Sequence, residues 1–238
     1  MSRYPKYVSV AEMKEKNRKK SVKLLKKNPN LGPINISGRA IAKTWWGKAW
    51  NKNLEIYADY SNRLSRGRSY LKNGAVVDLI INEGVINALV IGSGRNMYNI
   101  QINIDAANEE KMKEIVIKIE GRLSSLEKLI EGKFPKELKE LFASDDSGLF
   151  PKESEIHFNC TCLDWADMCK HVVAVLYGVG AKLDEDPLLF FKLRNINVED
   201  LISDTIEKKS AKMIEKSKIK SKRVIDDKDM SDMFGIDI

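Results

Sequence analysis

The chain has 238 residues, of which 43% are hydrophobic and 32% are charged, enough for one large domain or two small ones. No window holds about 18 consecutive apolar residues, the first residues lack the apolar stretch of a secretory signal, and all three cysteines lie within ten residues of one another. These features argue against a membrane-spanning helix and a secreted disulfide scaffold, and they favour the reducing cytoplasm.

The net charge of +7 is distributed in blocks. Residues 1–72 hold 18 Lys and Arg against 4 Asp and Glu, residues 73–207 hold 14 against 24, and residues 208–223 hold 8 against 1. Basic arms on an acidic body are typical of proteins that bind nucleic acid or another polyanion, because such contacts release condensed counterions. The alternative is that the lysines only keep the surface solvated.

The first third of the chain is predicted to contain a basic arm and one helix. Residues 1–33 form the basic N-terminal arm, whose lysine-rich run at residues 11–29 has too few apolar side chains to hold a packed helix by itself. Residues 40–60 are predicted to be a helix, because Trp46 and Trp50 fall on one face with further apolar residues. A loop rich in arginine is expected to follow.

Three strands and a helix are predicted next. Residues 75–81, 85–91 and 97–104 are rich in β-branched residues and are separated by glycine-containing turns, which predicts an antiparallel meander with one face in water. Residues 106–131 carry apolar side chains at helical spacing, and a short helix opens at Pro135. Residues 34–148 are therefore expected to form one α+β domain with helices packed on its meander.

The three cysteines and both histidines occur in one short stretch. Cys160 and Cys162 follow a short predicted strand, where residues two apart share one face. Cys169 and His171 stand where a helix signal begins, which places Cys169 at or before the N-cap and His171 in the first turn. The six residues between these pairs fold the chain back, so four ligands can surround one point. The pattern predicts a single structural Zn²⁺ ion in a closed tetrahedral site.

Three alternatives to zinc remain for the cysteines: buried core residues, a C-x-C redox pair, or an iron–sulfur site. The helix N-terminus and Lys170 favour the thiolate forms that a metal requires. His157 lies on the opposite face of the strand and is expected to be a surface or packing residue.

The C-x-C, six-residue, C-x-H spacing before a helix resembles the SWIM zinc finger family. The residues Asp164-Trp165, Cys169 to Tyr177, Asp184 to Leu189 and Phe191 to Arg194 are similar to those of its bacterial members, and the segments at 45–50 and 66–70 resemble their N-terminal region. Leu163 stands where proline is common in the family.

The resemblance implies a ββα-type zinc module, here within residues 149–206 with short helices after it. Residues 207–238 are then a charged tail, either disordered or a lone exposed helix. Members of the family have been proposed to bind DNA or protein partners, and the bacterial ones are often associated with a Snf-type helicase.

A second set of candidate residues is basic or aromatic. Lys43, Lys48 and the tryptophans at 45, 46 and 50 can stack on bases beside phosphates, although the stripe of Trp46 and Trp50 is more typical of a core. Trp45 is off that stripe and is the better candidate for exposure. The candidates in the predicted loop are Arg63, Arg66 and Arg68, which can contact phosphates or simply be solvated in a turn.

No pattern of catalytic residues is present in the sequence. A Walker-type phosphate-binding loop is absent, and four protein ligands leave no position on a zinc ion for a catalytic water. The sequence therefore predicts a non-enzymatic accessory protein of a helicase or nucleic-acid system. It would bind DNA or RNA mainly through electrostatic contacts with the nucleic-acid backbone. The alternative is a protein–protein adaptor that binds the helicase without touching nucleic acid.

Overall fold

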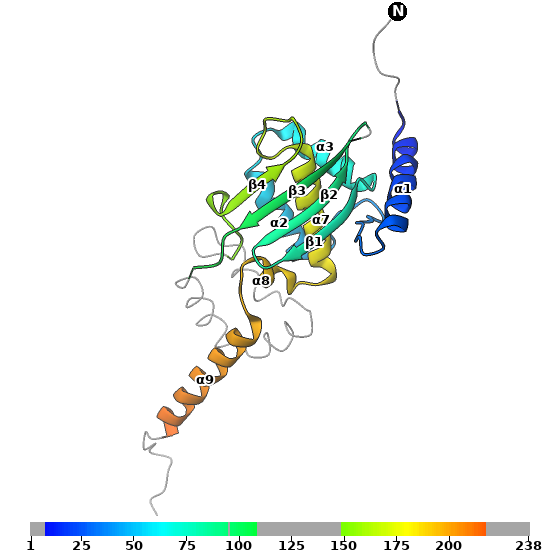
Figure 1. Ribbon diagram of the computed structural model, residues 1–238. Helices are drawn as coiled ribbons and strands as arrows, with labels where there is room; N and C mark the ends of the chain where they lie inside the picture. The colour runs from blue at the N-terminus through cyan, green and yellow to red at the C-terminus, as the bar shows by residue number, and fades with distance from the viewer. Residues whose placement is uncertain (1–7, 95, 109–148, 218–238) are drawn as a thin grey trace, which may run out of the picture.

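The computed structural model describes residues 8–94, 96–108 and 149–217 and has an α+β architecture (Figure 1). A four-stranded antiparallel sheet has the order β1-β2-β3-β4. In Figure 1 the helices α2, α3 and α7 lie behind this sheet. The strands are β1 (Val76–Asn82), β2 (Val85–Ile91), β3 (Met97–Ile104) and β4 (Ile156–Cys160). The helices are α1 (Val10–Lys27), α2 (Trp45–Ile56), α3 (Ser61–Lys72), α7 (Lys170–Glu185), α8 (Leu189–Leu193) and α9 (Val198–Ser217), with a 3₁₀ turn at Glu153–Glu155.

The predicted meander is confirmed, and its two faces follow the alternation of the sequence. In β3, Ile100, Ile102 and Ile104 are buried while the asparagines and glutamine between them are exposed. Gly84 lies in the β1–β2 turn with a φ of 63°, a conformation that costs a glycine little. One face of the sheet therefore carries the core and the other meets solvent.

Helix α7 is the centre of the core. Eleven of its sixteen residues are buried, among them Val172, Val173 and Val179. A helix that is apolar on nearly all sides must be covered on nearly all sides. Helices α2 and α3 supply one cover, including the fully buried Trp50, whose indole N–H donates to the Leu176 carbonyl at 3.0 Å. The sheet supplies the other.

Glycine permits the close approach of the helices. A Cβ atom at Gly67 of α3 would collide with the Val173 side chain of α7. Here the structure differs from the sequence prediction, because the arginine-rich residues after Ser61 form helix α3 and not a loop. Gly67 resembles a helix breaker in the sequence, but in the structure it allows the α3 backbone to lie against α7.

Helix α1 is a second element that composition alone does not predict. Its N-terminus has a capping box, in which the Ser9 hydroxyl accepts a hydrogen bond from the Glu12 backbone and the Glu12 carboxylate accepts one from the Ser9 backbone. Asn17 is the one buried residue of α1, and its side-chain amide donates to the Asn73 carbonyl at 3.0 Å. The helix is therefore held by its cap and by contacts to its neighbours, as its weak apolar face requires.

The residues predicted to bind zinc begin on a strand of the same sheet as β1, β2 and β3. β4 pairs with β3 from Ile100–Cys160 to Ile104–Ile156, so the strand that carries the first cysteine is the fourth strand of the same sheet. The core cluster also contains residues of both predicted parts. The family resemblance implies a ββα-type module within residues 149–206. In the structure, β4 belongs to the four-stranded sheet and α7 to the common core.

The remaining predictions fall at the ends of the described segments. The predicted helices at 106–131 and after Pro135 lie almost entirely outside the described residues. The tail predicted at 207–238 is helical as far as residue 217, as the end of α9, and in Figure 1 this helix points away from the sheet. Among the residues that the structure describes, no helix is both long and apolar enough to cross a membrane.

Candidate metal centre and basic groove

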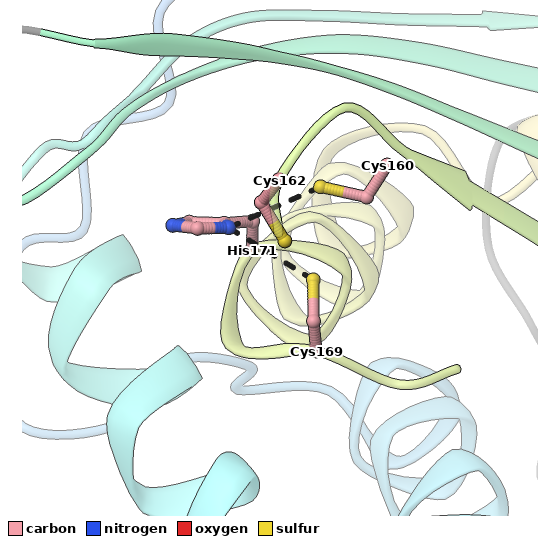
Figure 2. A group of neighbouring side chains, drawn as sticks. All are labelled: Cys160, Cys162, Cys169 and His171. Atoms are coloured by element: carbon pink, nitrogen blue, oxygen red, sulfur yellow. Dashed lines mark hydrogen bonds between the residues drawn. The ribbon is translucent and has the colours of Figure 1, made fainter. Parts of the chain in front are cut away.

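All four predicted metal ligands meet at the junction of β4 and α7. Cys160 ends β4, and Cys162 follows two residues later. Cys169 is the N-cap of α7 and His171 is in its first turn, as the sequence predicts. Figure 2 shows the three sulfur atoms grouped beside the imidazole ring. The strand and the helix thus each contribute a pair of ligands.

The distances suit a four-coordinate ion. The candidate ligand atoms all lie within 4.8 Å of one another. The sulfurs of Cys160 and Cys169 are each 3.9 Å from Nδ1 of His171 (Figure 2). Zn–S bonds of about 2.3 Å and Zn–N bonds of about 2.0 Å in a tetrahedron separate the ligand atoms by roughly 3.5–3.8 Å. Small side-chain movements would therefore complete the shell, and the cluster can hold a metal ion such as zinc.

His171 is oriented by aromatic neighbours. Its ring lies 4.4 Å from the ring of Tyr98 and 5.2 Å from that of Tyr70, measured between centroids. Nδ1 faces the sulfurs, while Nε2 is buried and has no hydrogen-bond partner among the described residues. The two tyrosine rings thus pack against the imidazole, whose Nδ1 is the nitrogen nearer the sulfurs.

The thiols are unequal in acidity. The Cys160 thiol donates a hydrogen bond to Cys169 and lowers the pKa of Cys169 to about 4, with smaller help from the His171 side chain and from backbone N–H groups at the start of α7. The same hydrogen bond, together with burial, raises the pKa of Cys160. Burial raises the pKa of Cys162. Cys169 is therefore the thiolate that a cation meets first.

The loop between the two ligand pairs is clamped to α3 and to the turn before it. Arg63 donates to the Asp164 carboxylate at 2.9 Å, and both side chains are largely buried, at 17% and 10% exposure. Lys170 lies 3.8 Å from the same carboxylate. Burial opposes ionisation of Asp164, yet the hydrogen bond from Arg63 holds its pKa below the usual value. Asp59 accepts the backbone N–H of Asp167 at 3.0 Å.

Two residues that the sequence singled out near the centre, His157 and Arg63, each lie beside a carboxylate. His157 is 57% exposed and lies 3.2 Å from Asp105, apart from the cluster, which confirms its place on the other face of β4. Arg63 donates to the Asp164 carboxylate, and its predicted contact with phosphates stays a prediction.

The structure brings two of the predicted phosphate contacts together in a groove of about 340 Å³. The groove runs beside α2 and α3, and Lys48 and Arg68 line it. Its other charged lining residues, which we group with them as the basic groove, are Arg39, Lys52, Glu55 and Lys72. Among the described lining residues, five cations thus face a single carboxylate.

Contacts within the basic groove fix two of its cations. Arg68 pairs with Glu55, donates through Nε to the Tyr177 hydroxyl at 2.8 Å, and lies over the Tyr177 ring at 5.2 Å. Lys72 donates to the Arg39 carbonyl at 2.7 Å. Lys48 and Lys52 are exposed and have no ion-pair partner among the described residues.

Three other predicted contacts lie outside this groove. Lys43 is exposed but does not line it. Arg66 is exposed on the flank of α3 that carries Arg63. Trp45 is half-buried, like Trp46, and meets the Trp46 ring edge-on at 5.7 Å, so the structure does not set it apart from Trp46 as the exposed tryptophan. Arg39 and Lys72 were not predicted to lie with these residues. Arg68 and Lys72 are one helical turn apart, and this spacing is informative only once α3 is known to be a helix.

The comparison with known proteins finds one relative that says nothing of function. A protein of Mycobacterium tuberculosis, described as "Uncharacterized protein Rv2102", is 34% identical to this chain over 166 residues. The match covers 69% of this chain and 60% of the relative, so the chain spans less than two thirds of that protein's length. No protein-family model matches the chain. No solved structure matches it either.

Proposed function

We propose that the chain is a zinc-binding, non-catalytic protein of the SWIM type that binds nucleic acid through the phosphate backbone and acts beside a Snf-type helicase. The observation that carries the nucleic-acid part is the basic groove, where five cations face one carboxylate. Such a groove attracts a polyanion of any sequence, because the free energy comes from counterion release.

Zinc is the metal we propose for the Cys160, Cys162, Cys169 and His171 cluster. Three thiolate sulfurs and one imidazole nitrogen are a typical donor set of structural zinc sites. These four residues would fill a tetrahedral shell, so the ion would have a structural role: it would fasten the end of β4 to the start of α7. A filled shell also supports a non-enzymatic protein, since no position is left for a reacting water.

The basic groove would bind the phosphate backbone of a nucleic acid without distinguishing its base sequence. Lys48 and Lys52 supply mobile ammonium groups, while Arg68 is held by Glu55 and Tyr177 and presents a fixed guanidinium. Contacts of this kind position a nucleic acid but carry no sequence information. The partner helicase, proposed from the family resemblance, would supply any directed activity.

Salt dependence tests this proposal. Binding of a fluorescent single-stranded oligonucleotide is measured by anisotropy from low to moderate salt, and the zinc content is measured by elemental analysis. We expect log K to fall linearly with log salt, and the Lys48→Ser and Lys52→Ser variants to lose about 0.7 each from the slope. Lys152→Ser, an exposed lysine outside the groove, is the matched control and should leave the slope unchanged.

Two results would overturn the proposal. A flat salt dependence, or no binding of any polyanion, would favour the protein–protein adaptor. A folded protein without zinc, whose Cys160→Ser and Cys169→Ser variants are as stable as the parent, would remove the metal.

A further inference from the structure

The two large hydrophobic side chains most exposed to solvent lie together on the loop at the metal centre. Among the described residues, Leu163 is fully exposed and Trp165 is 77% exposed, whereas the other three tryptophans are half-buried or fully buried. A tryptophan costs free energy when it is left in water, and proteins that bind with aromatic side chains keep them exposed for this purpose. The exposure of Trp165 and Leu163 therefore indicates a binding role.

Trp165 is held in place. Its ring meets the Tyr60 ring edge-on, with centroids 5.2 Å apart. The preceding residue, Asp164, is fastened by Arg63, and the N–H groups of the two residues after Ala166 are directed at Asp59. With 77% of its surface exposed, the Trp165 side chain keeps room for a flat ligand beside Tyr60. Because the surrounding loop is already ordered, a ligand would not have to immobilise it.

The contact with Tyr60 places Trp165 near the start of α3, the helix whose later residues line the basic groove. Helices α2 and α3 both line the groove, and the turn between them at residues 57–60 carries Tyr60. The twelve residues of α3 span roughly 18 Å, from the turn beneath Trp165 to Lys72 in the groove. A strand of a few nucleotides covers this length, within the range of site sizes for single-strand binding folds.

The charges around Trp165 favour stacking over another phosphate contact. Arg63 and Lys170 are paired with Asp164, and Asp59 and Asp167 are exposed nearby, so these groups carry two positive and three negative charges and leave no excess positive charge for a phosphate. An aromatic face without excess charge binds the face of a base. A base within a duplex has both faces covered by its neighbours, so only an unpaired base can use this site.

We propose that Trp165 is a stacking platform for one base of a single-stranded nucleic acid whose phosphates lie in the basic groove. The inference rests on the proposed function and adds the substrate class, an unpaired strand. Leu163 provides an apolar contact beside the stacked base.

The test separates base contacts from phosphate contacts. The full-length protein is titrated with a 12-residue oligo(dA) and with an abasic strand of the same length and charge. Trp165→Ala should weaken oligo(dA) binding by about 5- to 100-fold and leave abasic binding unchanged. Trp165→Phe, which keeps a ring, should retain most of the affinity. Ile56→Ala, at another exposed apolar residue, is the matched control and should change neither.

Intrinsic fluorescence gives a second readout. Stacking with oligo(dA) should quench the fluorescence of the parent, and the quenching should be much weaker in Trp165→Phe, because Trp50 is fully buried and Trp45 and Trp46 are half-buried. Far-UV circular dichroism and zinc content verify that each variant is folded.

The outcomes distinguish the two proposals. If both strands bind with salt dependence but Trp165→Ala binds them as the parent does, the stacking platform is refuted and the proposed function stands. If neither strand binds at all, the proposed function itself fails.

Discussion

The unequal thiols of the metal centre predict how many protons zinc displaces. At pH 8 Cys169 is already a thiolate, because its pKa is lowered to about 4, while Cys160 and Cys162 keep their protons because the hydrogen bond to Cys169 and burial raise the pKa of Cys160 and burial raises the pKa of Cys162. Zinc binds thiolates, so its binding must expel the protons of those two thiols. We expect a release of two protons per ion, and an apparent affinity that rises about 100-fold per pH unit near pH 8.

Calorimetry measures this release directly. Zinc is titrated into the metal-free, reduced protein at pH 8 in buffers of different ionisation enthalpy, and the slope of observed heat against that enthalpy gives the proton count. In a Cys162→Ser variant that still binds zinc, the count should fall to one, since this variant has one thiol fewer to ionise. A count of three in the parent would show that Cys169 is protonated before zinc arrives, and it would refute the reasoning from the helix N-terminus and the Cys160 hydrogen bond.

Two further substitutions test the packing that supports the site. Gly67→Ala should lower the free energy of unfolding by about 1–3 kcal/mol, because its methyl group would strike Val173; an unchanged or raised stability in chemical denaturation would show that the helices separate easily. Arg63→Met should lower it by about 1–2 kcal/mol and Arg66→Met by much less, because Arg63 alone is paired with a largely buried carboxylate; equal thermal shifts for the two variants would contradict this account.

The metal ligands were predictable from the sequence because spacing alone constrains them. Cys160 and Cys162 follow a strand pattern, and Cys169 and His171 precede a helix pattern, so local geometry already brings each pair to one point. The β-meander was predictable for the same reason, since alternation along 97–104 reports one buried face. These signals depend on residues close in the chain.

Helix α3 and the basic groove were not predictable because their causes are distant in the chain. Gly67 is suited to a helix only when Val173 lies against it, more than a hundred residues later. The pairing of Arg63 with Asp164 likewise joins residues 101 positions apart in the chain. Periodicity cannot report a partner on another element, and β4 joined the main sheet through such a contact with β3.

The late position of α7 has a consequence for biosynthesis. The sheet strands β1 to β3 end at Ile104, but the helix that covers their apolar face begins at Lys170. During translation the nascent meander therefore waits with its isoleucines uncovered until the ribosome has released the chain beyond Glu185. Contacts between segments so far apart form slowly, and exposed strands of this kind aggregate. Packing of the meander onto α7 therefore comes late in the synthesis of the chain.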